Sequence, residues 1–441
     1  MQTATRPERN PDQELARCER SRAEGERLPN IKRMVLSDLA RQTASASSPN
    51  PTSGAGPSTI YDVAIVGAGI IGLATALELR AAGLSVVVFD RQLAMHEASW
   101  AAGGMLAADD PGNPEAIHEL SVYSRSLYPE FLIRIQQLTG RSIALRTERT
   151  LEGLPMDGPE HRTPSNASPC TVAELEEAAP GLTSAPLAQG LRFVSLEEQS
   201  LDPCDLTEVL PVAVRAAGIE LHEHTPVLRV ERAQALSQIF YTRTAEAAKQ
   251  ADSPCTERSI LSHHVLFATG AWLAPIAQPP AIVPCKGNML RLELNGPVQT
   301  RCVLRIPGLY LIPRGQNTRG KVEYVVGATL ERVGFDQTPS ETLLANLADR
   351  AAALWPPLAQ AKRIDGWAGL RPESPDGLPV IGAFSTADRA HKNLWMATGH
   401  FRNGILQAPG TARLLCDLIT GKRRAIPLEQ FCCDRFLAST I

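Results

Sequence analysis

Hydrophobic residues follow two different periods along residues 60–90 of the chain. Residues 61–66, Tyr-Asp-Val-Ala-Ile-Val, are a short run rich in β-branched side chains, typical of a strand buried on both faces. Residues 73–82 carry alanine and leucine at helical spacing, and a second apolar run, Ser-Val-Val-Val-Phe, follows at 85–89. This order predicts a strand, a helix and a second strand, which together form a β-α-β unit of a parallel sheet.

Three glycines, Gly67, Gly69 and Gly72, join the first strand to the helix in the spacing G-x-G-x-x-G. The first permits a tight turn, the second lets the backbone approach a pyrophosphate, and the third lets the helix pack close to the strand. The helix N-terminus offers N–H groups and the positive end of its dipole to phosphate. Asp90 ends the second strand, where its carboxylate can accept both ribose hydroxyls of an adenosine. We therefore predict a dinucleotide site rather than an ordinary loop-rich β-α-β unit.

Two further stretches indicate that the dinucleotide carries a flavin. Residues 97–106, Glu-Ala-Ser-Trp-Ala-Ala-Gly-Gly-Met-Leu, are small and glycine-bearing, which lets the backbone come close to a flat ligand. An alanine-rich buried helix is the alternative, but it does not explain the paired glycines. Residues 399–404, Gly-His-Phe-Arg-Asn-Gly, predict a second glycine turn before a helix. Its N-terminus suits the N1–C2=O end of a reduced flavin, where negative charge develops.

The remaining pattern predicts a second, different sheet. Apolar residues alternate along 284–294, 309–314 and 321–330, with turn signals between them, which is typical of antiparallel strands. Residues 264–272 instead predict a buried strand that ends in a small-residue turn below the nucleotide. Four further helices are expected, at 114–138, at 172–179 behind a capping box of Thr171 and Glu174, at 200–217, and at 339–354.

Arg371 lies among apolar residues in a predicted strand, close to Trp367. An unpaired guanidinium would be costly there. One interpretation is a structural ion pair with Asp365 or Asp376. The other is a bidentate clamp for a substrate carboxylate, which the planar guanidinium forms better than lysine.

Composition and charge exclude several other classes of protein. The 441 residues are enough for two or three domains, and the net charge of -3 gives no general attraction to nucleic acid or to an anionic membrane. No apolar run is long enough to span a bilayer. The nine cysteines include no C-x-x-C pair, and His222 and His224 have no third ligand nearby, so neither a disulfide framework nor a metal site is predicted. We expect a cytoplasmic enzyme; a homo-oligomer is left open.

Five motifs together make residues 60–424 resemble a known family. They are Val-Gly-Ala-Gly-Ile-Ile-Gly at 66–72, Glu-Ala-Ser-Trp-Ala-Ala-Gly-Gly-Met-Leu at 97–106, Glu-His-Thr-Pro-Val-Leu at 223–228, Trp-Ala-Gly-Leu-Arg-Pro at 367–372, and Gly-His-Phe-Arg-Asn-Gly-Ile-Leu at 399–406. The stretch resembles the D-amino-acid oxidase superfamily of flavoproteins, and most closely the glycine oxidases associated with thiazole (thiamine) biosynthesis.

This resemblance implies which residues hold a non-covalent FAD. The implied contacts are Ile70, Ile71, Asp90, Arg91, Ala98, Ser99, Gly103, Gly104, Met105, Val227, His400, Phe401, Arg402, Asn403, Gly404, Ile405 and Leu406. Gly67, Gly69, Gly72 and Gly399 of the two glycine turns complete the predicted cofactor site. The resemblance also implies that Arg371 and Arg402 hold the substrate and that Tyr310 hydrogen-bonds its carboxylate.

The implied reaction is the oxidative deamination of glycine or another small amine or amino acid. Glycine, O2 and water would give glyoxylate, ammonia and hydrogen peroxide, or iminoglycine for thiazole assembly. We expect positioning and electrostatics, rather than a dedicated acid or base, to supply the catalysis. Gly308 and Leu330 stand where family members can carry histidine and methionine, so the choice among glycine, sarcosine and small D-amino acids stays open. A D-amino-acid dehydrogenase that reduces a quinone and a non-catalytic FAD-binding subunit are the alternatives.

The predicted fold class is α/β: a Rossmann-like FAD-binding domain with an interleaved α+β substrate domain built on an antiparallel sheet. The polar, Ser- and Pro-rich start of the chain predicts a disordered extension. The expected boundaries are 1–59 for this extension, 60–108, 200–280 and 365–425 for the FAD-binding domain, 109–199 and 281–364 for the substrate domain, and 426–441 for a C-terminal tail.

Overall fold

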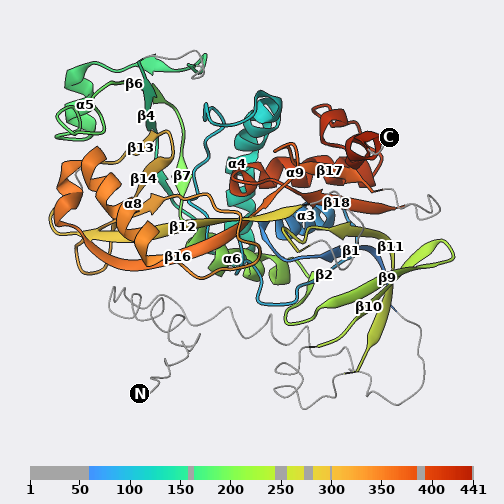
Figure 1. Cartoon of the computed structure of the whole chain (residues 1–441). Helices are drawn as coiled ribbons and strands as arrows, with labels where there is room; N and C mark the ends of the chain where they lie inside the picture. Colours follow the sequence, from blue (N-terminus) through green and yellow to red (C-terminus); the bar gives the residue numbers. More distant parts are fainter. Residues whose placement is uncertain are drawn as a thin grey trace, which may run out of the picture.

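The computed structural model describes residues 59–156, 163–243, 256–272, 282–297, 300–384 and 393–439. The predicted N-terminal extension lies outside these ranges except for residue 59. The described chain builds two eight-stranded sheets and a small two-stranded one. The two large sheets lie next to each other, with helices covering each of them (Figure 1). No helix in these ranges is both long enough and apolar enough to cross a bilayer.

The first sheet contains the predicted β-α-β unit at its centre. α3 (Ile70–Ala81) connects β1 to β2, and both neighbours of β1 run parallel to it. The strand order is β17 (Val380–Ala383), β18 (Leu394–Thr398), β11 (Arg258–Phe267), β1 (Ile60–Val66), β2 (Val86–Phe89) and β8 (Glu220–His222). β10 (Leu236–Tyr241) pairs with β11, and β9 (Val227–Ala233) pairs with β10. β17, β9 and β10 run antiparallel to their neighbours, and the others are parallel.

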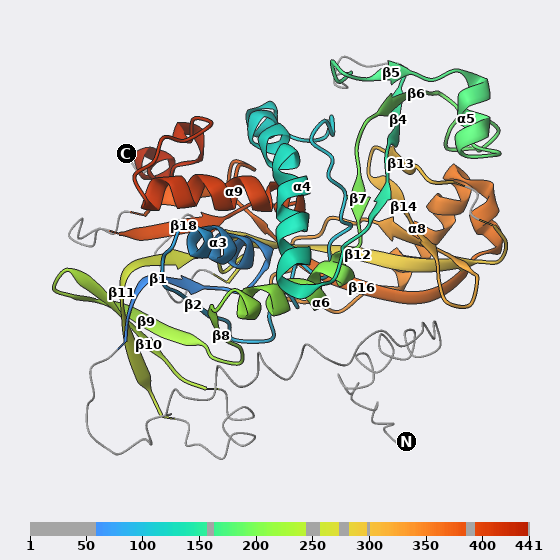
Figure 2. The same ribbon diagram turned by 180° about the vertical axis from the view of Figure 1, so that it is seen from behind.

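Four helices pack together beside this sheet (Figure 2). They are α3, α4 (His118–Thr139), α6 (Pro203–Ala216) and α9 (Gly404–Ile419). Their apolar faces and the inward side chains of the sheet form the largest core of the molecule, which includes Leu73, Leu120, Leu210 and Leu415. Because α3 and α9 pack against each other, these two helices lie in the same layer.

The second sheet is antiparallel except where β13 and β4 pair in parallel. Its order is β16 (Lys362–Glu373), β12 (Val283–Leu294), β15 (Val322–Gly327), β14 (Leu309–Gln316), β13 (Val303–Ile306), β4 (Thr150–Pro155), β6 (Leu191–Leu196) and β5 (Ser168–Pro169). α8 (Glu341–Leu354) and α5 (Val172–Ala178) pack beside it (Figure 1). The remaining elements are β3 (Leu145–Thr147) paired with β7 (Ser200–Leu201), and the 3-10 helices η1 (Glu115–Ile117), η2 (Pro356–Gln360), η3 (Glu429–Phe431) and η4 (Cys433–Ser439).

The predicted fold class is confirmed, including the capping box in which Thr171 and Glu174 bond reciprocally at the start of α5. Two structural features lie at the predicted domain boundaries, which remain a proposal. Residue 365 falls inside β16, and all of β16 belongs to the second sheet because β16 pairs with β12 along its length. The predicted C-terminal tail buries Leu428 and Phe431 in the core beside the first sheet, since these isolated apolar residues find partners only in the folded chain.

Candidate cofactor and substrate site

A cavity of about 660 Å³ lies between the two large sheets. The predicted site residues that line it are Gly67, Gly69, Ile70, Ile71, Asp90, Arg91, Ala98, Ser99, Gly103, Gly104, Met105, Val227, Tyr310, Arg371, His400, Phe401, Arg402, Asn403, Gly404 and Ile405. Three others do not line it. Gly72 and Gly399 belong to the two glycine turns but do not contribute to the cavity wall, and Leu406 is buried in the helical core. The fold therefore brings almost all of the predicted residues to one place.

The glycine turn after β1 depends on the absence of side chains. Gly67 has a φ of +107°, and a Cβ atom there would lie 2.3 Å from the carbonyl oxygen of Ala268. A Cβ atom on Gly72 would lie 2.0 Å from the carbonyl oxygen of Gly67. β1, β11 and α3 thus approach each other too closely for any side chain at these two positions.

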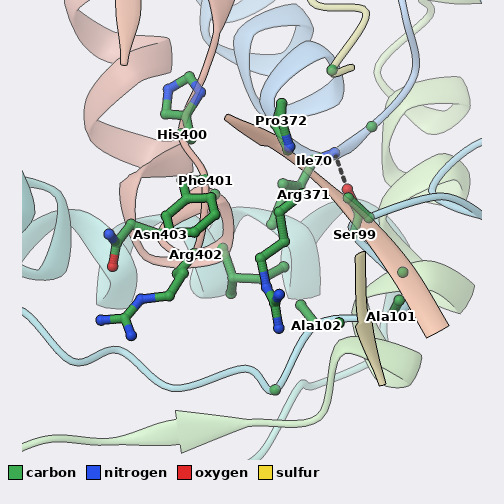
Figure 3. A pocket seen from close by; sticks show the side chains of 18 of the residues that line it. Ile70, Ser99, Ala101, Ala102, Arg371, Pro372, His400, Phe401, Arg402 and Asn403 are labelled. Carbon is green, nitrogen blue, oxygen red and sulfur yellow. Dashed lines mark hydrogen bonds between the residues drawn. The ribbon is translucent and has the colours of Figure 1, made fainter. Parts of the chain in front are cut away.

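The side chains of Asp90 and Ser99 accept hydrogen bonds from backbone N–H groups of this glycine turn and of the helix start after it. Asp90 accepts hydrogen bonds from the N–H groups of Ala68, at 2.7 Å, and Gln92, at 2.8 Å. Burial raises the pKa of the Asp90 carboxyl, and these two donors counteract the rise. Ser99 accepts a hydrogen bond from the N–H of Ile70 at 3.0 Å, as Figure 3 shows. Each carboxylate oxygen of Asp90 keeps a further acceptor position for a ribose hydroxyl.

Two helix N-termini face the cavity, and in neither does the residue before the helix cap it with its own side chain; at α3 the Ser99 hydroxyl occupies the N–H of Ile70 alone. α3 follows Gly69 and α9 follows Asn403; in both cases the preceding residue makes no side-chain cap hydrogen bond. Ile71 at the start of α3 and Ile405 at the start of α9 line the cavity. Open N–H groups and positive dipole ends attract phosphate and other anionic groups. A pyrophosphate at α3 and an electron-rich flavin ring at α9 both fit this arrangement.

Tyr310 and Arg371 approach the cavity from the second sheet, and two glycines make room for them. A Cβ atom on Gly327 would lie 2.5 Å from the Tyr310 hydroxyl oxygen, and one on Gly287 would lie 2.2 Å from Arg371 Nη2. The sequence interpretation did not select these glycines. A glycine inside a predicted strand was the available signal, because it often marks a close approach.

Arg371 makes no ion pair with any described residue, which argues against the structural ion-pair interpretation. Its Nη1 donates to the carbonyl oxygen of Thr329 at 3.1 Å, whereas Asp376 pairs with Arg435. The guanidinium groups of Arg371 and Arg402 extend the same way in Figure 3. Burial raises the pKa of the Tyr310 phenol although both arginines counteract the rise, so the hydroxyl stays protonated and can donate to a carboxylate.

Arg402 and His400 differ in their surroundings. Arg402 pairs with Asp110 at 3.1 Å and also donates to Asn113 at 3.3 Å, so the loop before α4 orients its guanidinium. His400 is buried and its Nε2 lies 3.0 Å from the hydroxyl of Thr411. Burial lowers the pKa of His400 to about 3, so the ring is neutral and adds no charge at the start of α9.

A buried charged cluster beside the cavity was absent from the predicted site. Arg305 on β13 pairs with Glu152 on β4 and, at 3.0 Å, with Glu198. Arg305, Glu152 and Asp110 line the cavity, whereas Glu198 does not. The available sequence signal was a charged residue between apolar neighbours, in two stretches where no strand had been predicted.

Gly327→Ala is expected to displace the Tyr310 ring and to weaken substrate binding by about 10²-fold, since misplacing a reacting group by 1 Å has effects of this size. The readout is KM for the amino-acid substrate, together with the FAD content of the purified protein. FAD content should not change, because Gly327 does not line the cavity. Gly366→Ala is the control. Gly366 lies in the same sheet, on β16, and its new Cβ atom would meet only the flexible end of the Leu344 side chain on α8. An unchanged KM in Gly327→Ala would contradict the role given to Tyr310.

The glycine turn, the two helix N-termini and the two arginines that line the cavity define a dinucleotide-binding protein of the flavoprotein class. The comparison with protein families identifies it further. The chain belongs to the family of FAD dependent oxidoreductases (DAO), whose profile matches residues 62–418. The prediction of FAD as the cofactor is thereby confirmed.

Similar proteins support the predicted resemblance to glycine oxidases. The chain is 33% identical over 377 residues to a glycine oxidase of Pseudomonas aeruginosa, covering 82% of this chain and 96% of that protein. It is 32% identical over 386 residues to the bifunctional protein ThiO/ThiG of Trichormus variabilis, covering 85% of this chain and 55% of that protein. The crystal structure of glycine oxidase from Geobacillus kaustophilus matches with a TM-score of 0.73 at 27% identity, covering 85% of this chain and 99% of that one.

Proposed function

We propose that the protein catalyses the FAD-dependent oxidative deamination of glycine or another small amine or amino acid. With glycine, O2 and water, the products are glyoxylate, ammonia and hydrogen peroxide, and the iminoglycine formed on the way serves thiazole synthesis. The observation that carries this proposal is Arg371, a guanidinium on the cavity wall without an ion pair among the described residues, placed next to Tyr310. The similarity to glycine oxidases and to ThiO/ThiG supports it.

The residues of the second sheet bind and orient the substrate. Arg371 receives the carboxylate through charge-assisted hydrogen bonds, and the protonated Tyr310 donates a further one. Both groups come from strands of a packed sheet, so the carboxylate fixes where the α-carbon stands. Bound FAD supplies the two-electron acceptor for the α-C–H bond, and dioxygen then takes up the electrons to give hydrogen peroxide. The residues that would hold FAD are those of the glycine turn, Asp90, Ser99 and the start of α9.

A panel of amines tests this proposal. Under anaerobic conditions, glycine, sarcosine, D-alanine and D-proline are added separately to the holoenzyme, and the loss of flavin absorption is recorded. We expect glycine to bleach the flavin and admitted air to restore it with one hydrogen peroxide per flavin. Dye or quinone reduction without peroxide would favour the dehydrogenase alternative instead. Flavin that no amine bleaches would contradict the proposal and favour a non-catalytic FAD-binding subunit.

The proposal places the enzyme in the cytoplasm. No disulfide joins cysteines in the described part of the chain, and Cys285 and Cys302 are buried thiols, as a reducing compartment allows. Cell fractionation with an antibody to the protein tests the location. Size-exclusion chromatography with light scattering measures whether a homo-oligomer forms.

A further inference from the structure

Asn288 is a buried residue next to the cavity wall to which the proposed reaction assigns no task. It lies on β12 between Gly287 and Met289, which both line the cavity, whereas Asn288 does not. Its exposed fraction is 0%. Successive side chains of a strand point to opposite faces of the sheet, so the Asn288 amide lies on the face away from the cavity. A buried amide is costly unless it is hydrogen-bonded, and its partners show what it holds in place.

The side-chain amide of Asn288 bonds to the segment that connects β15 to α8. The Asn288 Nδ2 donates to Thr329 Oγ1 at 3.0 Å, and the backbone N–H of Asn288 donates to the same oxygen at 2.9 Å. Nδ2 also donates to the Glu331 carboxylate, and Oδ1 accepts from the N–H of Ser340 at 2.8 Å. The Thr329 hydroxyl in turn donates to Glu331 at 3.1 Å. Two donors of one residue therefore hold Thr329.

Thr329 is also the residue that bonds to the guanidinium of Arg371. Arg371 lies on β16, where it pairs with Cys285 of β12. Its side chain crosses β12 above Gly287, where a Cβ atom would lie 2.2 Å from Nη2. Beyond β12, Nη1 donates to the carbonyl oxygen of Thr329 at 3.1 Å. The position of this carbonyl thus sets the direction in which the other N–H groups of Arg371 point.

Polar contacts, rather than apolar packing, hold the chain at Thr329. β15 ends two residues earlier, at Gly327, and the next residue, Leu330, is 53% exposed. The backbone N–H of Thr329 lies 3.4 Å from the carbonyl oxygen of Asn288, which is a long hydrogen bond. A guanidinium binds a carboxylate best through two parallel N–H donors, so a small rotation weakens both bonds.

We infer that Asn288 is a positioning residue for the substrate carboxylate. It holds Thr329, and the Thr329 carbonyl orients the Arg371 guanidinium toward the bound molecule. Asn288 itself lies outside the cavity wall and acts only through these two residues. This inference rests on the proposed function, because it takes Arg371 as the group that binds the carboxylate.

The test is the binding of acetate to the holoenzyme, measured by the change in flavin absorption. Acetate has a carboxylate and no amine, so its Kd reports on the carboxylate site without turnover. We expect Asn288→Ala to raise this Kd, and KM for glycine, by roughly 10-fold to 10²-fold, the size of effect that a displacement of about 1 Å produces. Thr329→Val, which replaces only the hydroxyl, should raise both values in the same direction and is the milder change to the fold.

A double-mutant cycle shows whether Asn288 acts through Arg371. In Arg371→Leu there is no guanidinium to orient, so adding Asn288→Ala should change the acetate Kd by less than about twofold. Lys286→Met is the matched control. Lys286 is also buried on β12, but it pairs with Asp336 at 2.8 Å, further along the same connecting segment. Its acetate Kd should stay at the wild-type value.

Three results would overturn the inference alone. They are an unchanged acetate Kd in both Asn288→Ala and Thr329→Val, the full loss repeated in the Arg371→Leu background, and an equal loss in Lys286→Met. If the wild type binds no acetate, or if Arg371→Leu binds it equally well, the carboxylate clamp is wrong and the inference fails with it. If acetate binds as expected but no amine bleaches the flavin, the proposed function fails while the role of Asn288 in carboxylate binding stands.

Discussion

Arg371→Leu should raise KM for glycine and lower kcat/KM by about 10²-fold or more. The substitution removes charge-assisted hydrogen bonds to the substrate carboxylate, each worth about 1.5–3 kcal/mol. It leaves the nucleotide side of the cavity untouched, so FAD content should match the wild type. Steady-state kinetics with glycine, and the ratio of flavin to protein absorption, measure the two effects.

Two other arginine variants sharpen this experiment. Arg371→Lys keeps the charge but loses the planar two-pronged donor, so its KM should fall between those of wild type and Arg371→Leu. Arg332→Leu removes a neighbouring arginine that pairs with Glu373 and is 64% exposed at its side chain, and its KM should stay at the wild-type value. An unchanged KM in Arg371→Leu would refute the carboxylate clamp.

Gly67→Ala should yield a protein with little or no bound FAD and a lowered Tm. The new Cβ atom would sit 2.3 Å from the carbonyl oxygen of Ala268, and a φ of +107° strains any residue with a side chain. Neither β1 nor β11 can yield, because both are central strands with neighbours on each side. The turn must therefore rearrange where the pyrophosphate binds. Flavin absorption of the purified protein and a thermal melt are the measurements.

Gly83→Ala is the matched control. It introduces the backbone strain of a positive φ, but its new Cβ atom makes no steric clash. Gly83 has a φ of +91°, and a Cβ atom there would have no heavy atom within 4 Å. This variant should lose about 1 kcal/mol of stability and retain its FAD. Full FAD content and a wild-type Tm in Gly67→Ala would show that the turn is not under the constraint we describe.

The nucleotide side of the site could be predicted from the sequence because its parts are close together in the chain. Gly67 and Gly72 follow β1 at once, and Asp90 ends β2. Their positions depend on one strand, one turn and one helix, whose hydrophobic periods are visible locally. The start of α9 was also predictable, since a glycine turn before an apolar helix is a local pattern. Its position beside α3 was not, and only the resemblance indicated that both helix starts contact the cofactor.

The substrate side could be predicted only in part. Arg371 and Tyr310 were found, but the glycines that make room for them, Gly287 and Gly327, and the carboxylate of Glu152 were not. Each of these acts through a residue on another strand. A sequence with several alternating strands does not specify their order or register, and a shift of one residue turns every side chain to the opposite face.

The sequence by itself determined the β-α-β unit with its glycine turn and terminal aspartate, and with them the class of cofactor. The tertiary structure alone decided that Glu152, Arg305 and Tyr310 share one row and that Arg371 has no ion-pair partner among the described residues. The physical reason is the range of the interactions: turns, caps and helix starts are set by neighbours in the chain, whereas the row of charged residues exists only after β4, β13 and β14 have paired.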